Sequence, residues 1–452
     1  MAVNSDESSN LEDIEGAFRS LSLRSAEDPN ALAVLAQASR SNEAVREQLA
    51  DPKILRILVD TVECSVNDAV DTAELALRCI GNACIDNNAA REQVCKLGFS
   101  WAKLCLPVVD AVDGAYDSTL AVLTAKVLYN ICSDYEAAQQ QCFEEHIHHS
   151  LIRLCSSRAV VDGSEKSLFI ELLFWICSHM QPDRDTLPTN VLPELVALPN
   201  LHKGTLDPED FAFLVETCLL FLREPAVKRD LVAHKLVKDV WQMLQMNEET
   251  VIMLHDNEDD RRLLAPLTTA IIWILSDLAA STEFAATYPV GDQWLQNVVV
   301  VTIYAADVTH EDFQSTIRLV DAACQIMGNR LWAVSEPVDT DSEHQIGGLF
   351  RPLLAILTTS QDVELLHSAA GLLIQLARLY AEVRESVGAD PESQSIIQKL
   401  CNHGMPQLKQ DGIALLKVLG KNSPGNQEKL ANLAREILES SAEATDSAMI
   451  EA

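Results

Sequence analysis

A short helical phrase recurs along this chain at a spacing that limits what the chain can fold into. Glu43–Leu49 (EAVREQL) returns 45 residues later, at Asn88–Val94 (NAAREQV), and a third copy lies at Ala381–Val387 (AEVRESV). Each copy follows a helix-like run of apolar residues: 31–38, 75–84 and 369–379. A unit of this kind cannot bury its apolar face alone, so neighbouring units are expected to stack on one another.

The composition favours an all-α fold. Gly and Pro number only 16 each in 452 residues, and aromatic residues make up 5%, whereas Ala, Leu, Glu and Gln, which form helices well, dominate. Repeats of about 40–47 residues with two or three helices are typical of armadillo and HEAT proteins. We therefore expect an all-α, right-handed armadillo/HEAT-type superhelical solenoid of roughly nine helical repeats.

The two ends of the chain differ in composition from the repeats. Residues 1–10 are rich in Ser, Asn, Asp and Glu, which predicts a disordered acidic leader. The solenoid is expected to fill residues 11–438. Residues 439–452 are mostly small or acidic, which predicts a flexible acidic tail.

The formal net charge is −33, from 67 acidic and 34 basic residues. Such a charge argues against nucleic acid and against an anionic membrane surface, because both require clustered Lys and Arg. It suits a partner with a basic segment, which a negative groove would attract. The alternative is that the acidic surface only keeps the protein soluble.

Sequence features of membrane and secreted proteins are missing from this chain. Residues 1–15 have no apolar signal core, and the longest apolar run, 263–280, is interrupted by Asp277. The twelve cysteines form no CxxC pair, and most lie in apolar helical runs, as buried thiols do. We expect a cytoplasmic protein, with the nucleus as a second location.

No catalytic or cofactor motif is present. Gly420-Lys421-Asn422-Ser423 lacks the preceding glycine of a phosphate-binding loop, and no GxSxG, HExxH or calcium-binding loop occurs. We therefore expect no cofactor and no catalytic chemistry.

One group of residues has the composition of a metal site. It comprises Cys142, His146, His148, His149 and Cys155. Because the histidines fall where a turn between two helices is expected, we interpret them as exposed turn residues beside buried cysteines. No metal is therefore predicted.

The candidate binding residues occupy equivalent places near the ends of successive apolar helices. Asn82, Asn130 and Trp175 share one register, and Asp86 and Asp134 follow the two asparagines by four residues. Amide side chains in such a row could hydrogen-bond the backbone of an extended peptide. Alternatively, each Asn caps or packs within its own unit, and both interpretations remain open. Arg78 and Lys126 precede the asparagines by four residues, so the groove would be charge-mixed.

Two stretches resemble a known family. Leu77–Asn87 (LRCIGNACIDN) and Leu128–Asp134 (LYNICSD) resemble the third armadillo helix and following turn of the small-GTPase dissociation stimulator (smgGDS) family, and next those of ataxin-10. The resemblance is clear over about residues 75–160. It implies a cytosolic protein without its own nucleotide site, which binds small GTPases that have basic, prenylated tails. It also implies that Asn82, Asn130, Asp86 and Asp134 correspond to the groove residues of that family.

Two functions follow as hypotheses. The first is a guanine-nucleotide exchange factor or chaperone for such GTPases, acting without catalytic chemistry of its own. The second is a noncatalytic scaffold or assembly chaperone for a multiprotein complex, similar to ataxin-10.

Overall fold

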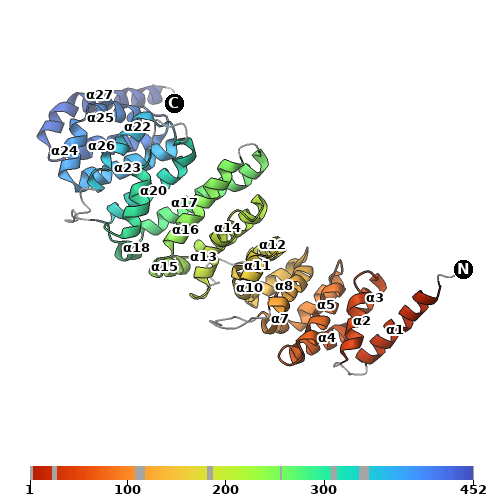
Figure 1. Ribbon diagram of the computed structural model, residues 1–452. Helices are drawn as coiled ribbons and strands as arrows, with labels where there is room; N and C mark the ends of the chain where they lie inside the picture. The colour runs from red at the N-terminus through yellow and green to blue at the C-terminus, as the bar shows by residue number, and fades with distance from the viewer. Residues whose placement is uncertain are drawn as a thin grey trace. The chain divides into compact units, whose positions relative to one another are not determined.

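The computed structural model describes residues 4–22, 28–106, 118–180, 187–254, 257–306, 313–334 and 346–450. These residues form helices and the turns between them, with no strand, so the all-α prediction is confirmed for this part of the chain. The chain divides into two compact units, Met1–Val227 and Lys228–Ala452 (Figure 1).

Unit 1 contains α1 to α14, and α15 crosses the unit boundary. Their bounds are α1 (Asn4–Ser22), α2 (Pro29–Ala38), α3 (Glu43–Leu49), α4 (Pro52–Ser65), α5 (Val70–Ala83), α6 (Asn88–Leu97), α7 (Ser100–Cys105), α8 (Ser118–Cys132), α9 (Glu136–Glu144), α10 (Ile147–Ser156), α11 (Arg158–Val161), α12 (Lys166–Cys177), α13 (Leu192–Leu201), α14 (Pro208–Leu222) and α15 (Pro225–Ala233).

Two rows of helices run through unit 1. In the first row, α2, α5, α8, α12 and α14 each pack against the next, and in the second, α4, α7, α10 and α13 do the same. The short α3, α6 and α9 connect one repeat to the following one. Each three-helix unit therefore buries its apolar side chains against its neighbours, as the repeat spacing predicts.

The recurring phrase makes a recurring hydrogen bond. Its arginine reaches back seven residues to a carbonyl at the end of the preceding long helix, where carbonyls lack a helical partner. The bonds are Arg46 Nη1 to Ser39 O (3.5 Å), Arg91 Nε to Cys84 O (3.0 Å) and Arg384 Nη1 to Ala377 O (3.1 Å). Gln139 Nε2 makes the equivalent bond to Cys132 O at 2.8 Å. This side chain of the phrase therefore caps the C-terminal end of the preceding long helix.

The turns after these long helices also repeat. Asp86 and Asp134 both adopt φ +51°, in the left-handed region that Asp and Asn tolerate better than most residues. Asn42 and Asn87 then cap α3 and α6 by accepting the backbone N–H of Val45 and of Ala90.

Unit 2 contains the helices after α15. Their bounds are α16 (Val237–Met253), α17 (Glu258–Ala280), α18 (Thr282–Thr287), η1 (Leu295–Val300), α19 (Val301–Tyr304), α20 (Phe313–Trp332), α22 (Phe350–Thr359), α23 (Val363–Leu379), α24 (Ala381–Ala389), α25 (Glu392–Cys401), α26 (Pro406–Gly420) and α27 (Pro424–Ile450). The helices α17, α20, α23 and α26 form a row in which each packs against the next.

Among the residues that the structure describes, one helix, α17, is long and apolar enough to span a membrane. Half of the relevant window of α17 is buried inside the protein, and the helix packs against α16 and α20. These contacts account for its buried apolar residues as part of a protein core.

The cysteines are all free thiols, and all but Cys64 and Cys95 are buried. The prediction that most are small apolar core residues is confirmed. Burial raises the pKa of the Cys79 and Cys155 thiols to about 12.

At the two ends the structure extends the helices beyond the expected limits. α1 begins at Asn4, inside the segment expected to be a disordered leader, and α27 runs to Ile450, inside the expected tail.

Candidate functional site

The structure places the predicted residues of unit 1 on three neighbouring helices of one row. Asn82 lies on α5, Asn130 on α8 and Trp175 on α12. The Trp175 ring stacks on that of Tyr129, with 4.9 Å between the ring centroids. The three residues that share a register in the sequence therefore lie near the ends of consecutive helices in one row.

The amide nitrogens of the two asparagines bond to the preceding repeat. Asn82 Nδ2 donates to Ala36 O (3.2 Å) and to Ser39 Oγ (2.8 Å), and Asn130 Nδ2 donates to Gly81 O (3.3 Å). These bonds join neighbouring helices of the row, which favours the structural interpretation of both residues. Both side chains are half-buried, so each retains a surface that a partner could contact.

Asp86 and Asp134 are exposed in the turns after these helices. The left-handed backbone of these turns accounts for an Asp at both positions, and the two carboxylates are open to solvent.

The two basic residues of this stretch are paired with acidic ones. Arg78 Nη2 lies 3.5 Å from Glu74 Oε2, and Lys126 Nζ lies 2.6 Å from Glu165 Oε2. The mixed charge expected here is therefore largely neutralised within the protein.

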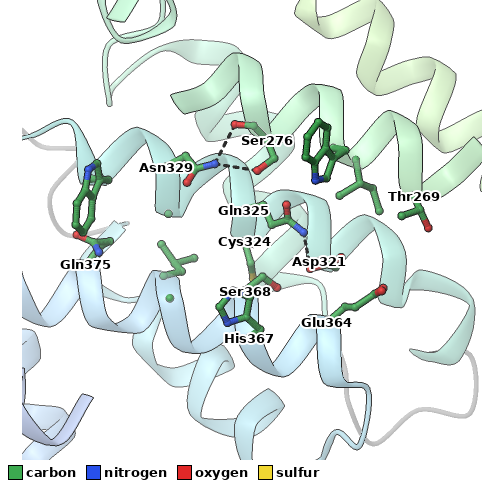
Figure 2. Close-up of a pocket in the computed structure, with 16 residues that line it drawn as sticks. Thr269, Ser276, Asp321, Cys324, Gln325, Asn329, Glu364, His367, Ser368 and Gln375 are labelled. Carbon is green, nitrogen blue, oxygen red and sulfur yellow. Dashed lines mark hydrogen bonds between the residues drawn. The ribbon is translucent and has the colours of Figure 1, made fainter. Parts of the chain in front are cut away.

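Unit 2 has a groove that the sequence did not indicate. Its volume is about 450 Å³, and its lining residues come from α17, α20 and α23 (Figure 2). Three consecutive helices of the unit 2 row thus form its walls.

Two tryptophans in this lining face solvent. Trp273 on α17 is 73% exposed and Trp332 on α20 is 72% exposed. Large apolar side chains gathered at an exposed groove are typical of protein-binding surfaces. In the sequence these tryptophans look like core residues, because both lie in long helical segments rich in apolar residues. Their exposure could therefore not be predicted from the sequence.

An asparagine in the groove repeats the contact of Asn82. Asn329 Nδ2 donates to both Ser276 O and Ser276 Oγ at 2.9 Å, joining α20 to α17 (Figure 2). The position of Asn329, equivalent to that of Asn82, could have indicated this groove from the sequence. Trp332 follows Asn329 by three residues and Trp273 precedes its partner Ser276 by three, so each tryptophan lies one helical turn from this contact.

The lining contains carboxylates and no Lys or Arg. Asp321 is buried and accepts a hydrogen bond from Gln325 Nε2 at 3.2 Å, and its burial raises the pKa of its carboxyl group. Glu364 pairs with Arg318. His367 Nδ1 lies 2.5 Å from Asp411 Oδ2, and this hydrogen bond raises the pKa of the imidazole.

The three turn histidines differ from expectation. His146 is exposed, but His148 is buried within α10 and His149 is half-buried. The interpretation as exposed turn residues is wrong for His148, because α10 begins at Ile147 and turns this side chain towards Phe143.

Comparison with known proteins gives no family for this chain. No protein-family model matches it, and no curated protein matches it in sequence. Among solved structures it is similar to an engineered protein, at 14% identity and a TM-score of 0.44, over 93% of this chain and 97% of the other. It is also similar to a chain from a study of a phosphorylation switch between cadherin and β-catenin, at 13% identity and a TM-score of 0.39, over 92% and 91% of the two chains. At these scores neither likeness carries an argument about function.

Proposed function

We propose that this chain is a noncatalytic, protein-binding armadillo-type solenoid whose groove in unit 2 holds an extended basic segment of a client protein. The observation that carries the proposal is the pair of tryptophans, Trp273 and Trp332, exposed in one groove on α17 and α20.

The groove has the chemistry that such a segment requires. Indole faces attract Lys and Arg and pack against their aliphatic stems. The half-buried Gln325 donates its amide nitrogen to Asp321, so its carbonyl oxygen is the atom that can accept a hydrogen bond from a peptide N–H.

Two arginines lie beside the lining, but Arg318 is paired with Glu364 and Arg378 donates to Gln375 and to the carbonyl of Leu331. The net charge of −33 favours the approach of a basic partner.

The identity of the client rests on the smgGDS resemblance. We propose small GTPases with basic, prenylated tails, for which the chain would act as an exchange factor or chaperone in the cytoplasm. An exchange factor needs only to bind the nucleotide-free GTPase more tightly than the GDP form, so no catalytic base is required. The alternative function is a noncatalytic scaffold or assembly chaperone for a multiprotein complex, similar to ataxin-10.

Calorimetric titration of the full chain with Rho- and Ras-type GTPases tests this proposal, using prenylated and unmodified forms, with GDP and without nucleotide. Trp273→Ala and Trp332→Ala should each weaken binding by about 10-fold or more, as at aromatic hot spots. Met253→Ala is the matched control, because Met253 is 76% exposed and lies outside the lining. It should leave the affinity unchanged.

Equal affinities for wild type and both tryptophan variants would remove the groove from the proposal. Failure to bind any GTPase, together with recovery of a stable complex that is insensitive to added nucleotide, would favour the scaffold.

A further inference from the structure

Three histidines gather where α9 meets α10. His146 ends the turn in a left-handed conformation (φ +62°), and His148 and His149 lie in the first turn of α10. One ring nitrogen from each residue lies within 4.8 Å of the others. Among the described residues, this is the group of His, Cys, Asp and Glu side chains close enough to share a metal ion.

The rings are held by packing. The His148 ring stacks on Phe143 at 4.4 Å between centroids, and the His149 ring stacks on His146 at 5.1 Å with 6° between the ring planes. Packing therefore holds His148 in the core, whereas His146 is open to solvent.

Two ring nitrogens of this group lack any hydrogen-bond partner. His148 Nδ1 and His149 Nε2 are both buried and unpaired, and His148 is only 2% exposed. Leaving a buried polar group unpaired costs about 1–3 kcal/mol, so each such group calls for an explanation such as an ion.

We propose that His146, His148 and His149 form a binding site for a divalent transition-metal ion, with Zn²⁺ as the ion that fits best. Zinc accepts neutral imidazole nitrogens at about 2.0–2.1 Å, and three protein ligands leave the fourth tetrahedral position to water. Tetrahedral bonds of that length bring the nitrogens to roughly 3.3 Å apart, so ring nitrogens that lie within 4.8 Å of one another must approach by at most about 1.5 Å. The exposed His146 side chain has room to make this movement.

The surroundings of His148 and His149 favour the neutral forms of these two rings. Burial and the neighbouring histidines lower the pKa of His148 well below its ordinary value and that of His149 to about 4. Arg153, which also lowers the pKa of His149, lies 3.4 Å from Glu194 and is thus paired with a carboxylate.

The two cysteines considered with these histidines do not belong to the group. The Cys142 Sγ atom lies 3.8 Å from Cys132 Sγ in the core, and Cys155 is fully buried. The donors are therefore imidazole nitrogens alone, a set that suits Zn²⁺, Cu²⁺ and Ni²⁺. An ion there would tie the α9–α10 turn together and stabilise unit 1.

Titration of the chelator-treated full chain with ZnCl₂ and CoCl₂ tests the site. One equivalent should bind, and Co²⁺ should show visible ligand-field bands without the intense near-ultraviolet band of thiolate coordination. His146→Gln and His149→Gln should each weaken binding by about 10-fold or more, because each removes one of three ligands. Zn²⁺ should raise the thermal midpoint of wild type and not of these variants.

His234→Gln and Cys64→Ser are the controls, since each removes an exposed potential ligand elsewhere. Circular dichroism establishes that the variants are folded, and His148 is left unchanged because it is part of the core. Wild-type affinity in His149→Gln, a thiolate band with Co²⁺, or no binding at micromolar metal would each overturn the proposal.

Discussion

At the scale of a single residue, a substitution of Asn82 distinguishes a structural role from a role in peptide binding. Its amide nitrogen donates to Ala36 O and Ser39 Oγ of the preceding repeat. Asn82→Ala should therefore lower the free energy of unfolding by about 1–2 kcal/mol, the sum of two ordinary hydrogen bonds. Urea denaturation of the variant and of wild type measures this difference.

Asp86→Asn is the control for that measurement. Asp86 is exposed and left-handed, and Asn tolerates the same backbone, so stability should change by less than about 0.5 kcal/mol. If Asn82→Ala is as stable as wild type, the hydrogen bonds of this amide do not stabilise the fold, and the amide is available to a ligand instead.

The sequence revealed which residues are equivalent, but not what each one touches. Asn82 and Asn130 share a register that alignment of the phrase predicts. Their partners lie 43 to 49 residues away and depend on how far one helix slides along the next. The exposure of Trp273 was not predicted, and His148 was expected to be exposed but is buried, for a related reason: whether a side chain is exposed depends on which helix covers it.

At the scale of helices, close packing of α25 on α26 depends on a glycine. A Cβ atom at Gly412 would lie 2.7 Å from Cys401 Sγ and 3.0 Å from Cys401 N, whereas a Cβ at Gly371 of α23 would meet nothing within 4 Å. Gly412→Ala should cost about 1–3 kcal/mol through overpacking. Gly371→Ala should stabilise the protein by about 0.5–1 kcal/mol, because Ala favours a helix interior. Denaturant titration of both variants gives the comparison, and a neutral Gly412→Ala would show that the helices can move apart freely.

Helix positions were easier to predict than helix contacts. Asn87 caps the start of α6, and Ser133-Asp134 form the turn before α9; Asn, Asp and Ser are residue types that favour turns and helix caps. Capping is local, so its signals lie within a few residues of the helix end. Packing of equivalent helices is not local, and a groove such as that on α17, α20 and α23 needs three helices at once.

At the scale of the whole molecule, the charge of −33 and the groove tryptophans should affect binding in different ways. Charge acts over distance and is screened by salt, with a Debye length of about 10 Å at 0.1 M and about 3 Å at 1 M. Contacts with Trp273 and Trp332 act at short range. The affinity for a Lys- and Arg-rich client tail should therefore fall on the order of 10-fold between 0.05 and 0.5 M NaCl.

The tryptophan variants separate the two contributions. Trp332→Ala should weaken binding by a similar factor at every salt concentration, because it removes local contacts and leaves the charge unchanged. A tail with its Lys and Arg residues replaced by Gln should instead lose most of the salt dependence. Calorimetric titration across the salt series measures both slopes. If wild-type affinity is independent of salt, the acidic excess serves solubility alone, and recognition depends on the groove contacts without help from long-range attraction.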